Sequence, residues 1–353
     1  MMMTSSLYLF LSSCKIVSGA DAFDYDFDVD RIVRFIKDTG ARKILMQLAD
    51  GLKQYSVRLS EIIEERTGCT CIVSADPCYG FCDVAEDEAD RLDVDAIVHI
   101  GHSSPRTQFR KPVLFIEAYS RLDVSRVIRK SVEALKKHGY TKVGLCASVQ
   151  HLRELPKAEE ILRKSGVEVY VGEDPSGMLS RGQVIGCNVS TALSVKDLVD
   201  CFIVVSGGNF HGLGVALYTG VRVFVADPYR EEVRDLSGLV RRTLAVRWYA
   251  ISKLRDAGRV GIVVGLKTGQ AFMEQALKLK KRLEEKSKKV YLFALREVVP
   301  EALVAFKDIE VFVIAACPRI PIDDYSSFHV PVLNVREAYM CLENYMGKYY
   351  DFK

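Results

Sequence analysis

Residues 43–76, KILMQLADGLKQYSVRLSEIIEERTGCTCIVSAD, contain the pattern from which the architecture can be predicted. Two apolar runs, KILMQL at 43–48 and CIVSAD at 71–76, flank an amphipathic helix expected around 54–66. Uninterrupted apolar runs that end in turn residues are typical of parallel strands buried on both faces. A strand, a crossover helix and a second strand therefore predict one unit of an α/β sheet.

The same order of elements occurs three times along the chain. Each set contains a helix, a strand, a second helix and three more strands, over roughly 100 residues, which is a usual domain size. The predicted strands lie at 43–48, 71–76, 95–101 and 112–119, then at 142–148, 167–172, 201–207 and 221–227, and finally at 259–265, 289–295, 311–317 and 331–335. We therefore predict an α/β protein of three related domains, residues 23–119, 120–229 and 230–353, each a small, mainly parallel sheet with flanking helices.

The composition limits the class of function. The chain has 353 residues, of which 49% are hydrophobic and 27% charged, as expected for a globular protein of two to three domains. Lysine and arginine number 49 against 46 acidic residues, and a net charge of +3 is too balanced for a general nucleic-acid binder. No apolar run is long enough for a transmembrane helix. Ten scattered cysteines suit a reducing, cytoplasmic setting better than a disulfide scaffold.

The first 22 residues are set apart from the three domains. They contain a short apolar core, but they lack a basic start and Lys15 interrupts the apolar stretch. We interpret residues 1–22 as a disordered or dispensable extension; the alternative is an export signal that ends near Ala22.

One cysteine in each set lies near the carboxyl end of a predicted strand. Cys82 lies in DPCYGFCD, Cys187 in VIGCN and Cys317 at the end of VFVIAAC, with separations of 187 − 82 = 105 and 317 − 187 = 130 residues. Open α/β sheets bind ligands beyond these strand ends, so three domains around a common axis would bring the three thiols together. Three thiolates suit a [4Fe–4S] cluster with one open iron. Spacing alone leaves open three unrelated buried cysteines, and Cys78, four residues before Cys82, is a further candidate.

Six segments at predicted strand ends carry a resemblance to a known family. They are LADGLKQY at 48–55, DPCYGFCD at 76–83, HIGHSS at 99–104, SGGNFHGLG at 206–214, KTGQ at 267–270 and ACPRIPIDD at 316–324. Together they resemble the iron–sulfur enzymes of diphthamide biosynthesis, the 2-(3-amino-3-carboxypropyl)histidine synthases, from about residue 24 onward. The length is similar to the archaeal homodimeric form. Ala49 stands where the family often has proline, which affects loop stiffness more than chemistry.

The resemblance implies the cofactor, the reaction and the partners. Cys82, Cys187 and Cys317 would each bind one iron of a [4Fe–4S] cluster at the centre of the three domains, and the open iron would hold S-adenosylmethionine. The reduced cluster would break the bond between sulfur and the methionine γ-carbon. The 3-amino-3-carboxypropyl group would join C2 of a histidine on translation elongation factor 2, which leaves methylthioadenosine. A homodimer and an electron donor of unknown identity are implied; no membrane or direct nucleic-acid contact is expected.

Polar residues near the same strand ends are candidates for contacts with S-adenosylmethionine. The candidates are Gly207, Gly208, Asn209, His211, Gln270 and Arg319. Glycines let backbone N–H groups approach a ligand, and an arginine can bind a carboxylate through two parallel hydrogen bonds. Each has a structural alternative: the glycines as turns, His211 as a local cap, and Arg319 as the partner of Asp323 or Asp324. We interpret His99 and His102 as pocket lining.

Two rival functions remain open at this level. A quinolinate-synthase-like protein would also have three α/β domains and three cysteines on one cluster, whose open iron acts as a Lewis acid in a dehydration. A non-enzymatic solute-binding protein of linked α/β domains would explain the fold and the signal-like start. It would leave the three cysteine contexts without a role.

Overall fold

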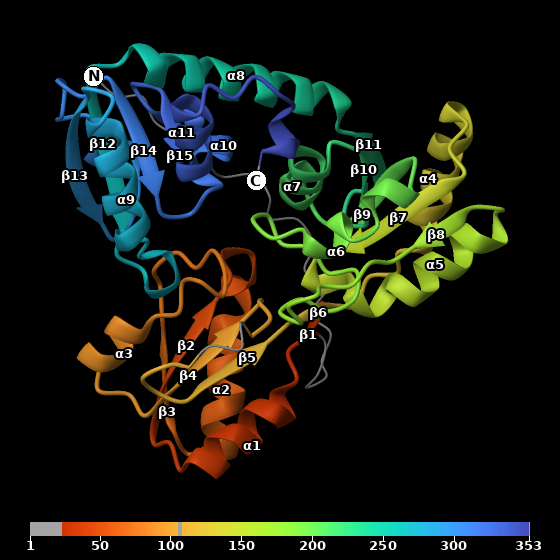
Figure 1. Ribbon diagram of the computed structural model, residues 1–353. Coiled ribbons are helices and arrows are strands. Elements are labelled where there is room, and N and C mark those ends of the chain that lie inside the picture. The colour runs from red at the N-terminus through yellow and green to blue at the C-terminus, as the bar shows by residue number, and fades with distance from the viewer. Residues whose placement is uncertain (1–22, 105–107, 353) are drawn as a thin grey trace, which may run out of the picture.

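The computed structural model describes residues 23–104 and 108–352. Its three larger sheets form three lobes whose loops approach one another at the centre of the molecule (Figure 1). This architecture confirms the predicted fold class, α/β with three mainly parallel sheets and flanking helices. The predicted extension, residues 1–22, lies outside the described residues.

The first sheet has the strand order β3-β2-β4-β5, and all of its strands are parallel. Its elements are α1 (Val29–Thr39), β2 (Lys43–Leu48), α2 (Ser56–Thr67), β3 (Thr70–Val73), α3 (Glu86–Arg91), β4 (Ala96–Ile100) and β5 (Val113–Ile116). In α1, Ile32, Val33 and Ile36 form one buried face. The Asp28 side chain accepts a hydrogen bond from the backbone N–H of Arg31 at the start of the helix.

The second sheet has the order β11-β10-β9-β7-β8. Its elements are α4 (Ser125–His138), β7 (Lys142–Ala147), α5 (Leu155–Lys164), β8 (Glu168–Tyr170), α6 (Ser190–Leu193), β9 (Cys201–Val205), α7 (Phe210–Thr219), β10 (Arg222–Asp227) and β11 (Glu232–Asp235). Only β11 is antiparallel to its neighbour. A short ladder of β1 (Tyr25–Asp26) and β6 (Tyr119–Ser120) joins the start of the first domain to its end.

The third sheet has the order β13-β12-β14-β15, again parallel throughout. Its elements are α8 (Ser237–Asp256), β12 (Arg259–Gly265), α9 (Met273–Glu284), β13 (Lys289–Leu295), β14 (Val311–Ala315), α10 (Ile320–Asp323), β15 (Val332–Asn334) and α11 (Val335–Leu342). Helix α8 runs along the top of the molecule and packs on both α11 and α7, so it connects the third domain to the second (Figure 1).

A buried ion pair holds α8 to α11. Arg247 and Glu337 are both fully buried, and their two hydrogen bonds measure 2.8 Å and 3.0 Å. The same guanidinium donates to the carbonyls of Pro321 and Val332. Because Pro321 lies in the segment that follows Cys317, this pair also supports the loop of the third cysteine.

All three sheets share one topology. When the four parallel strands of each domain are numbered along the chain, their order in the sheet is 2-1-3-4 each time. The chain leaves strand 1 toward one side and later returns to its other side, which opens a crevice at the carboxyl ends of strands 1 and 3. Residues just after β2, β4, β7, β12 and β14 line one central cavity, so the three crevices face a common point.

Two elements differ from the prediction. Helix α7 begins at Phe210, between two predicted strands where the sequence pattern indicated no helix. Its sequence, FHGLGVALYT, is apolar on nearly every side and buried, so it lacks the amphipathic pattern that predicts a helix. The third domain was predicted to begin at residue 230, but its first helix, α8, begins only at Ser237, since 232–235 form β11 against β10. The second sheet therefore extends to Asp235, past the predicted boundary between 229 and 230. Within the described residues, no helix has the length and apolar composition that crossing a membrane requires.

Candidate metal centre

Cys82, Cys187 and Cys317 line a single cavity of about 760 Å³. Cys82 lies in the loop between β3 and α3, Cys187 in the loop between β8 and α6, and Cys317 between β14 and α10. Each domain thus contributes one thiol, as the sequence predicted. Cys78 does not line this cavity; it is buried, and its sulfur lies 4.0 Å from Nε2 of His99.

The surroundings of the three thiols fit a soft metal centre. Burial raises the pKa of Cys82 and of Cys317, and it raises the pKa of Cys187 to about 12, with a further contribution from the other two sulfurs. Three mutually repelling thiolates are costly without a cation among them, and metal binding removes their protons. Sulfur ligands of this kind are those that iron–sulfur clusters use.

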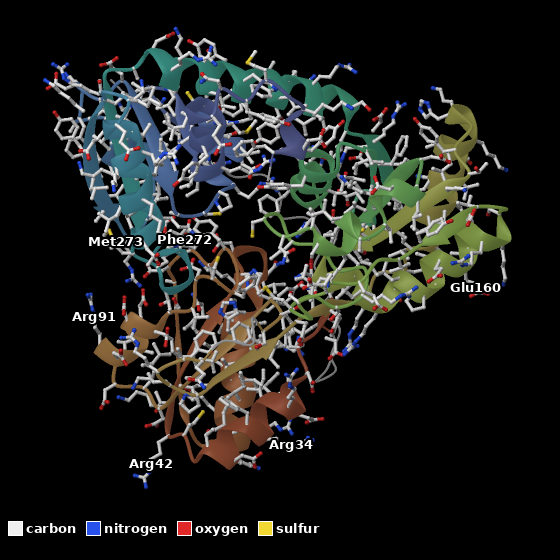
Figure 2. All side chains as sticks on the ribbon, in the orientation of Figure 1. Arg34, Arg42, Arg91, Glu160, Phe272 and Met273 are labelled. Atoms are coloured by element: carbon white, nitrogen blue, oxygen red, sulfur yellow. The ribbon has the colours of Figure 1, made fainter. Side chains whose placement is uncertain are left out.

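The first and third domains meet at Cys82. Nε2 of Gln270 donates a hydrogen bond of 3.3 Å to Sγ of Cys82, and the backbone N–H of Gly269 donates to the carbonyl of Cys82 at 3.0 Å. A Cβ on Gly269 would lie 2.5 Å from Cα of Cys82, so only glycine permits this approach. Phe272 and Met273 continue the segment into α9, on the side of the third domain that faces the first (Figure 2).

Lys267 makes a second link between the first and third domains. Its ammonium lies 2.8 Å from Asp83 and 2.7 Å from Glu297, and it lies over the ring of Tyr79. Lys267 is 8% exposed and Asp83 is 7% exposed. Because both charges are shielded from water, their mutual attraction offsets part of the free-energy cost of burying them.

The second and third domains meet at Arg319. Its NH1 donates to the carbonyls of Gly186 (2.8 Å) and Phe210 (2.9 Å), while Nε and NH2 bind both carboxylate oxygens of Asp323. The buried guanidinium also stacks on Phe210 at 4.0 Å. It therefore joins the loop of Cys187 to the loop of Cys317. The two parallel hydrogen bonds predicted for a ligand carboxylate are made to Asp323 instead, which was the structural alternative.

The first and second domains meet through two glutamines. Nε2 of Gln150 donates to the carbonyl of Gly101 at 2.9 Å, and Nε2 of Gln183 donates to Oγ of Ser103 at 2.9 Å. All four residues line the cavity. Each pair of domains is thus joined by hydrogen bonds at the wall of the site.

The six residues predicted to contact S-adenosylmethionine separate into two groups. His211, Gln270 and Arg319 line the cavity, whereas Gly207, Gly208 and Asn209 do not. The N–H of Gly208 donates to Asp227, and Oδ1 of Asn209 accepts from Arg234, so this segment forms the turn into α7. Gln270 donates to a cysteine sulfur rather than facing open space. These positions depend on where α7 begins, which the sequence pattern did not reveal.

His99 and His102 belong to a hydrogen-bonded chain beside Cys82. Nδ1 of His99 lies 2.9 Å from Oε1 of Gln47, and Nε2 of His99 lies 2.9 Å from Nδ1 of His102. His102 lines the cavity, as expected, and His99 is fully buried behind it. Gln47 was missed by the sequence reasoning. Its signal was a polar side chain within the apolar strand KILMQL.

The fold and the site define a class: a three-domain α/β protein with three thiols at one central cavity. Comparison with known proteins then gives the family. Residues 48–351 match the diphthamide synthesis protein family, and the chain belongs to that family.

Three relatives illustrate the match. The 2-(3-amino-3-carboxypropyl)histidine synthase of Pyrococcus horikoshii is 31% identical, over 90% of this chain and 91% of the relative. Subunit 1 of the Saccharomyces cerevisiae enzyme of the same name is 28% identical, over 93% of this chain and 78% of the relative. The crystal structure of Dph2 from Pyrococcus horikoshii with a 4Fe-4S cluster superposes with a TM-score of 0.82 at 30% identity, covering 93% of each chain. These similarities support neither the dehydratase nor the solute-binding alternative.

Proposed function

We propose that this protein is a 2-(3-amino-3-carboxypropyl)histidine synthase. It transfers the 3-amino-3-carboxypropyl group of S-adenosylmethionine to C2 of a histidine of translation elongation factor 2, the first step of diphthamide biosynthesis. The observation that carries the proposal is the convergence of Cys82, Cys187 and Cys317, one from each domain, on one cavity. Relatives that bear this enzyme's name, and a solved relative with a 4Fe-4S cluster, support it.

In the proposed mechanism, the thiolates of Cys82, Cys187 and Cys317 would hold the cluster and leave one iron available to S-adenosylmethionine. When bound and reduced, the cluster would supply the electron that breaks the bond between sulfur and the γ-carbon, and one electron and the C2 proton would be released once the new carbon–carbon bond has formed. The chain's own residues fix the thiolates: Gln270 and Gly269 hold Cys82, and Arg319 holds the loops of the other two.

The third domain provides the charged wall of the cavity. Every Asp, Glu, Lys and Arg among the described lining residues belongs to it: Lys267, Arg296, Glu297, Glu301, Arg319, Asp323 and Asp324. The three cations are paired with Asp83, Glu297, Asp87, Glu88 and Asp323. Glu301 and Asp324 form no ion pair within the described residues. Two such carboxylates suit a ligand with a sulfonium and an ammonium, as S-adenosylmethionine has. Of the six predicted contacts, we retain His211 for this ligand.

The finer features of the proposal follow the family resemblance. The protein acts as a homodimer in the cytoplasm, with an electron donor that its sequence does not identify. Elongation factor 2 is the protein substrate.

An anaerobic assay tests the proposal. The protein is purified without oxygen, its iron and sulfide are counted, and it is reduced with dithionite before S-adenosylmethionine and elongation factor 2 are added. We expect methylthioadenosine and a modified histidine. An intact cluster that leaves S-adenosylmethionine unchanged would favour Lewis-acid chemistry, and protein without iron, under conditions that protect clusters, would refute the enzyme.

A further inference from the structure

The hydrogen-bonded chain behind His102 fixes the position of each proton. Nε2 of Gln47 donates to the carbonyl of Asp83 at 2.7 Å, and the backbone N–H of Ala85 donates to Oε1 of Gln47 at 3.1 Å. A carbonyl only accepts and a backbone N–H only donates, so the orientation of this amide is determined. Oε1 is also 2.9 Å from Nδ1 of His99, which must therefore carry a proton.

The same reasoning passes from His99 to His102. Burial lowers the pKa of His99 well below its usual value, so the ring is neutral and its Nε2 holds a lone pair. Nδ1 of His102, at 2.9 Å, must then donate to it. Burial also lowers the pKa of His102 to about 4, so its Nε2 has a lone pair as well. Within the described residues this nitrogen has no hydrogen-bond partner, and the ring lines the cavity.

Apart from the two cysteines proposed to bind the cluster, the wall that contains His102 carries no formal charge. The cavity residues contributed by the first and second domains are histidine, glutamine, serine, cysteine, glycine and apolar or aromatic side chains. His211, on the same side, is neutral because burial lowers its pKa to about 4, and its Nδ1 has no partner among the described residues. A cationic ligand is better matched by Glu301 and Asp324 on the third-domain wall, which leaves His102 for a neutral group that donates a hydrogen bond.

We infer that the part of the neutral wall formed by His102, and not the part at His211, is the subsite for the imidazole of the protein substrate, and that Nε2 of His102 accepts a hydrogen bond from the imidazole N–H. This rests on the proposed function. C2 of an imidazole is bonded to both ring nitrogens, so a hydrogen bond to either nitrogen fixes the reacting carbon within one bond of the anchored atom. His102 touches the substrate, whereas Gln47 and His99 are positioning residues that set its tautomer.

The first test needs neither cluster nor substrate. The apoprotein is labelled with ¹⁵N-histidine, and the signals of His102 are assigned from their absence in His102→Phe. We expect a protonated Nδ1 and an unprotonated Nε2. A proton on Nε2 of His102 would overturn the inference. One zinc ion bound per protein molecule would also overturn it, because the possible ligand atoms of Cys78, His99 and His102 lie within 4.8 Å of one another and could bind that ion.

The second test uses the loaded enzyme and elongation factor 2. Methylthioadenosine and modified histidine are counted separately for the wild type, His102→Phe and the matched control His138→Phe, whose exposed histidine lies at the end of α4. We expect His102→Phe to lose about tenfold in histidine modification, the equivalent of one hydrogen bond, while S-adenosylmethionine cleavage continues. The control should retain both activities.

The alternatives give different results. Loss of cleavage together with transfer, in a variant that keeps its iron, would place His102 in the S-adenosylmethionine subsite and overturn the inference. Unchanged transfer would also overturn it. If the wild type produces neither product, the proposed function is wrong. The tautomer of His102 measured in the apoprotein does not depend on that outcome, so the two failures can be distinguished. If His102→Phe does not load its cluster, His102→Leu, which also lacks a hydrogen-bond acceptor, provides the same comparison.

Discussion

Nε2 of Gln270, in the third domain, donates a hydrogen bond of 3.3 Å to Sγ of Cys82, in the first. Hydrogen bonds to cysteine sulfur disperse the negative charge of a reduced cluster, so they raise its reduction potential. This contact joins two domains, and in the proposed centre it would also raise the reduction potential of the cluster.

Replacing Gln270 by leucine should lower the reduction potential. Without the N–H group, the added electron is less well stabilised, and we expect a shift on the order of tens of millivolts. A redox titration of the reconstituted protein, followed by absorbance or electron paramagnetic resonance, measures it. Gln54→Leu, at an exposed position, is the control. An unchanged potential in Gln270→Leu would contradict this role.

Each of the three cysteines should be required for cluster loading, whereas Cys78 should not. Serine at position 82, 187 or 317 removes one soft ligand, and iron and sulfide should fall well below the wild-type content after anaerobic reconstitution. Cys78→Ser is the matched control, because Cys78 lies in the same loop as Cys82 but does not line the cavity. Loss of iron in that variant would include Cys78 in the centre.

Gly269→Ala should separate the first and third domains at the site. The new Cβ would lie 2.5 Å from Cα and 2.7 Å from the carbonyl oxygen of Cys82. Relieving this clash requires a shift of the backbone, which costs more free energy than a change of side-chain rotamer. We expect reduced cluster content and reduced activity. Gly51→Ala, where a Cβ meets nothing within 4 Å, is the control and should load normally.

The buried pair Arg247–Glu337 should stabilise the third domain only as a pair. Arg247→Met leaves Glu337 buried without its partner and should lower the free energy of unfolding by about 3–5 kcal/mol. Arg247→Met combined with Glu337→Leu should cost less than the sum of the single changes. Urea unfolding measures both. Lys164→Met, which removes an exposed ion pair with Glu160, should change stability little.

His151 should make the protein sensitive to acid. Burial lowers its pKa from 6.5 to about 4, and neither ring nitrogen has a partner within the described residues. Between these values the unfolded chain binds a proton that the folded protein does not. Stability therefore falls as pH decreases from 6.5 toward 4, by on the order of 3 kcal/mol from this group.

His151→Leu should remove that part of the acid sensitivity. Urea midpoints measured above pH 6.5 and at about pH 5 should differ less in this variant than in the wild type. The exposed His138→Leu should keep the wild-type dependence. Identical pH dependence in His151→Leu and the wild type would show that His151 is accessible to protons in the folded state.

The sequence predicted the strands better than it predicted the connections between them. Apolar runs such as KILMQL and RVGIVVG became β2 and β12, because burial on both faces leaves a local signature. Helix α7 and strand β11 were missed. The first is nearly all apolar, and the second is a short, partly exposed strand whose pairing with β10 creates it.

In the site, too, local features could be predicted from the sequence, whereas contacts between distant segments could not. Each cysteine could be placed at a strand end from its local context, and the family resemblance implied that the three meet. The partners of Gln270 and Arg319 could not be predicted, because their contacts join residues 188 and 133 positions apart. His102 was placed in the pocket, but its tautomer depends on Gln47 and Asp83, in other loops and strands.

The sequence alone determined three α/β domains and one thiol at a carboxyl edge in each, because strand burial and strand ends are local properties of the chain. The tertiary structure decided which side chains face the common cavity, which are used to hold the domains together, and which wall is charged. Those properties arise only when the three sheets pack, since a hydrogen bond or a buried charge depends on the groups that packing brings within about 3 Å of it.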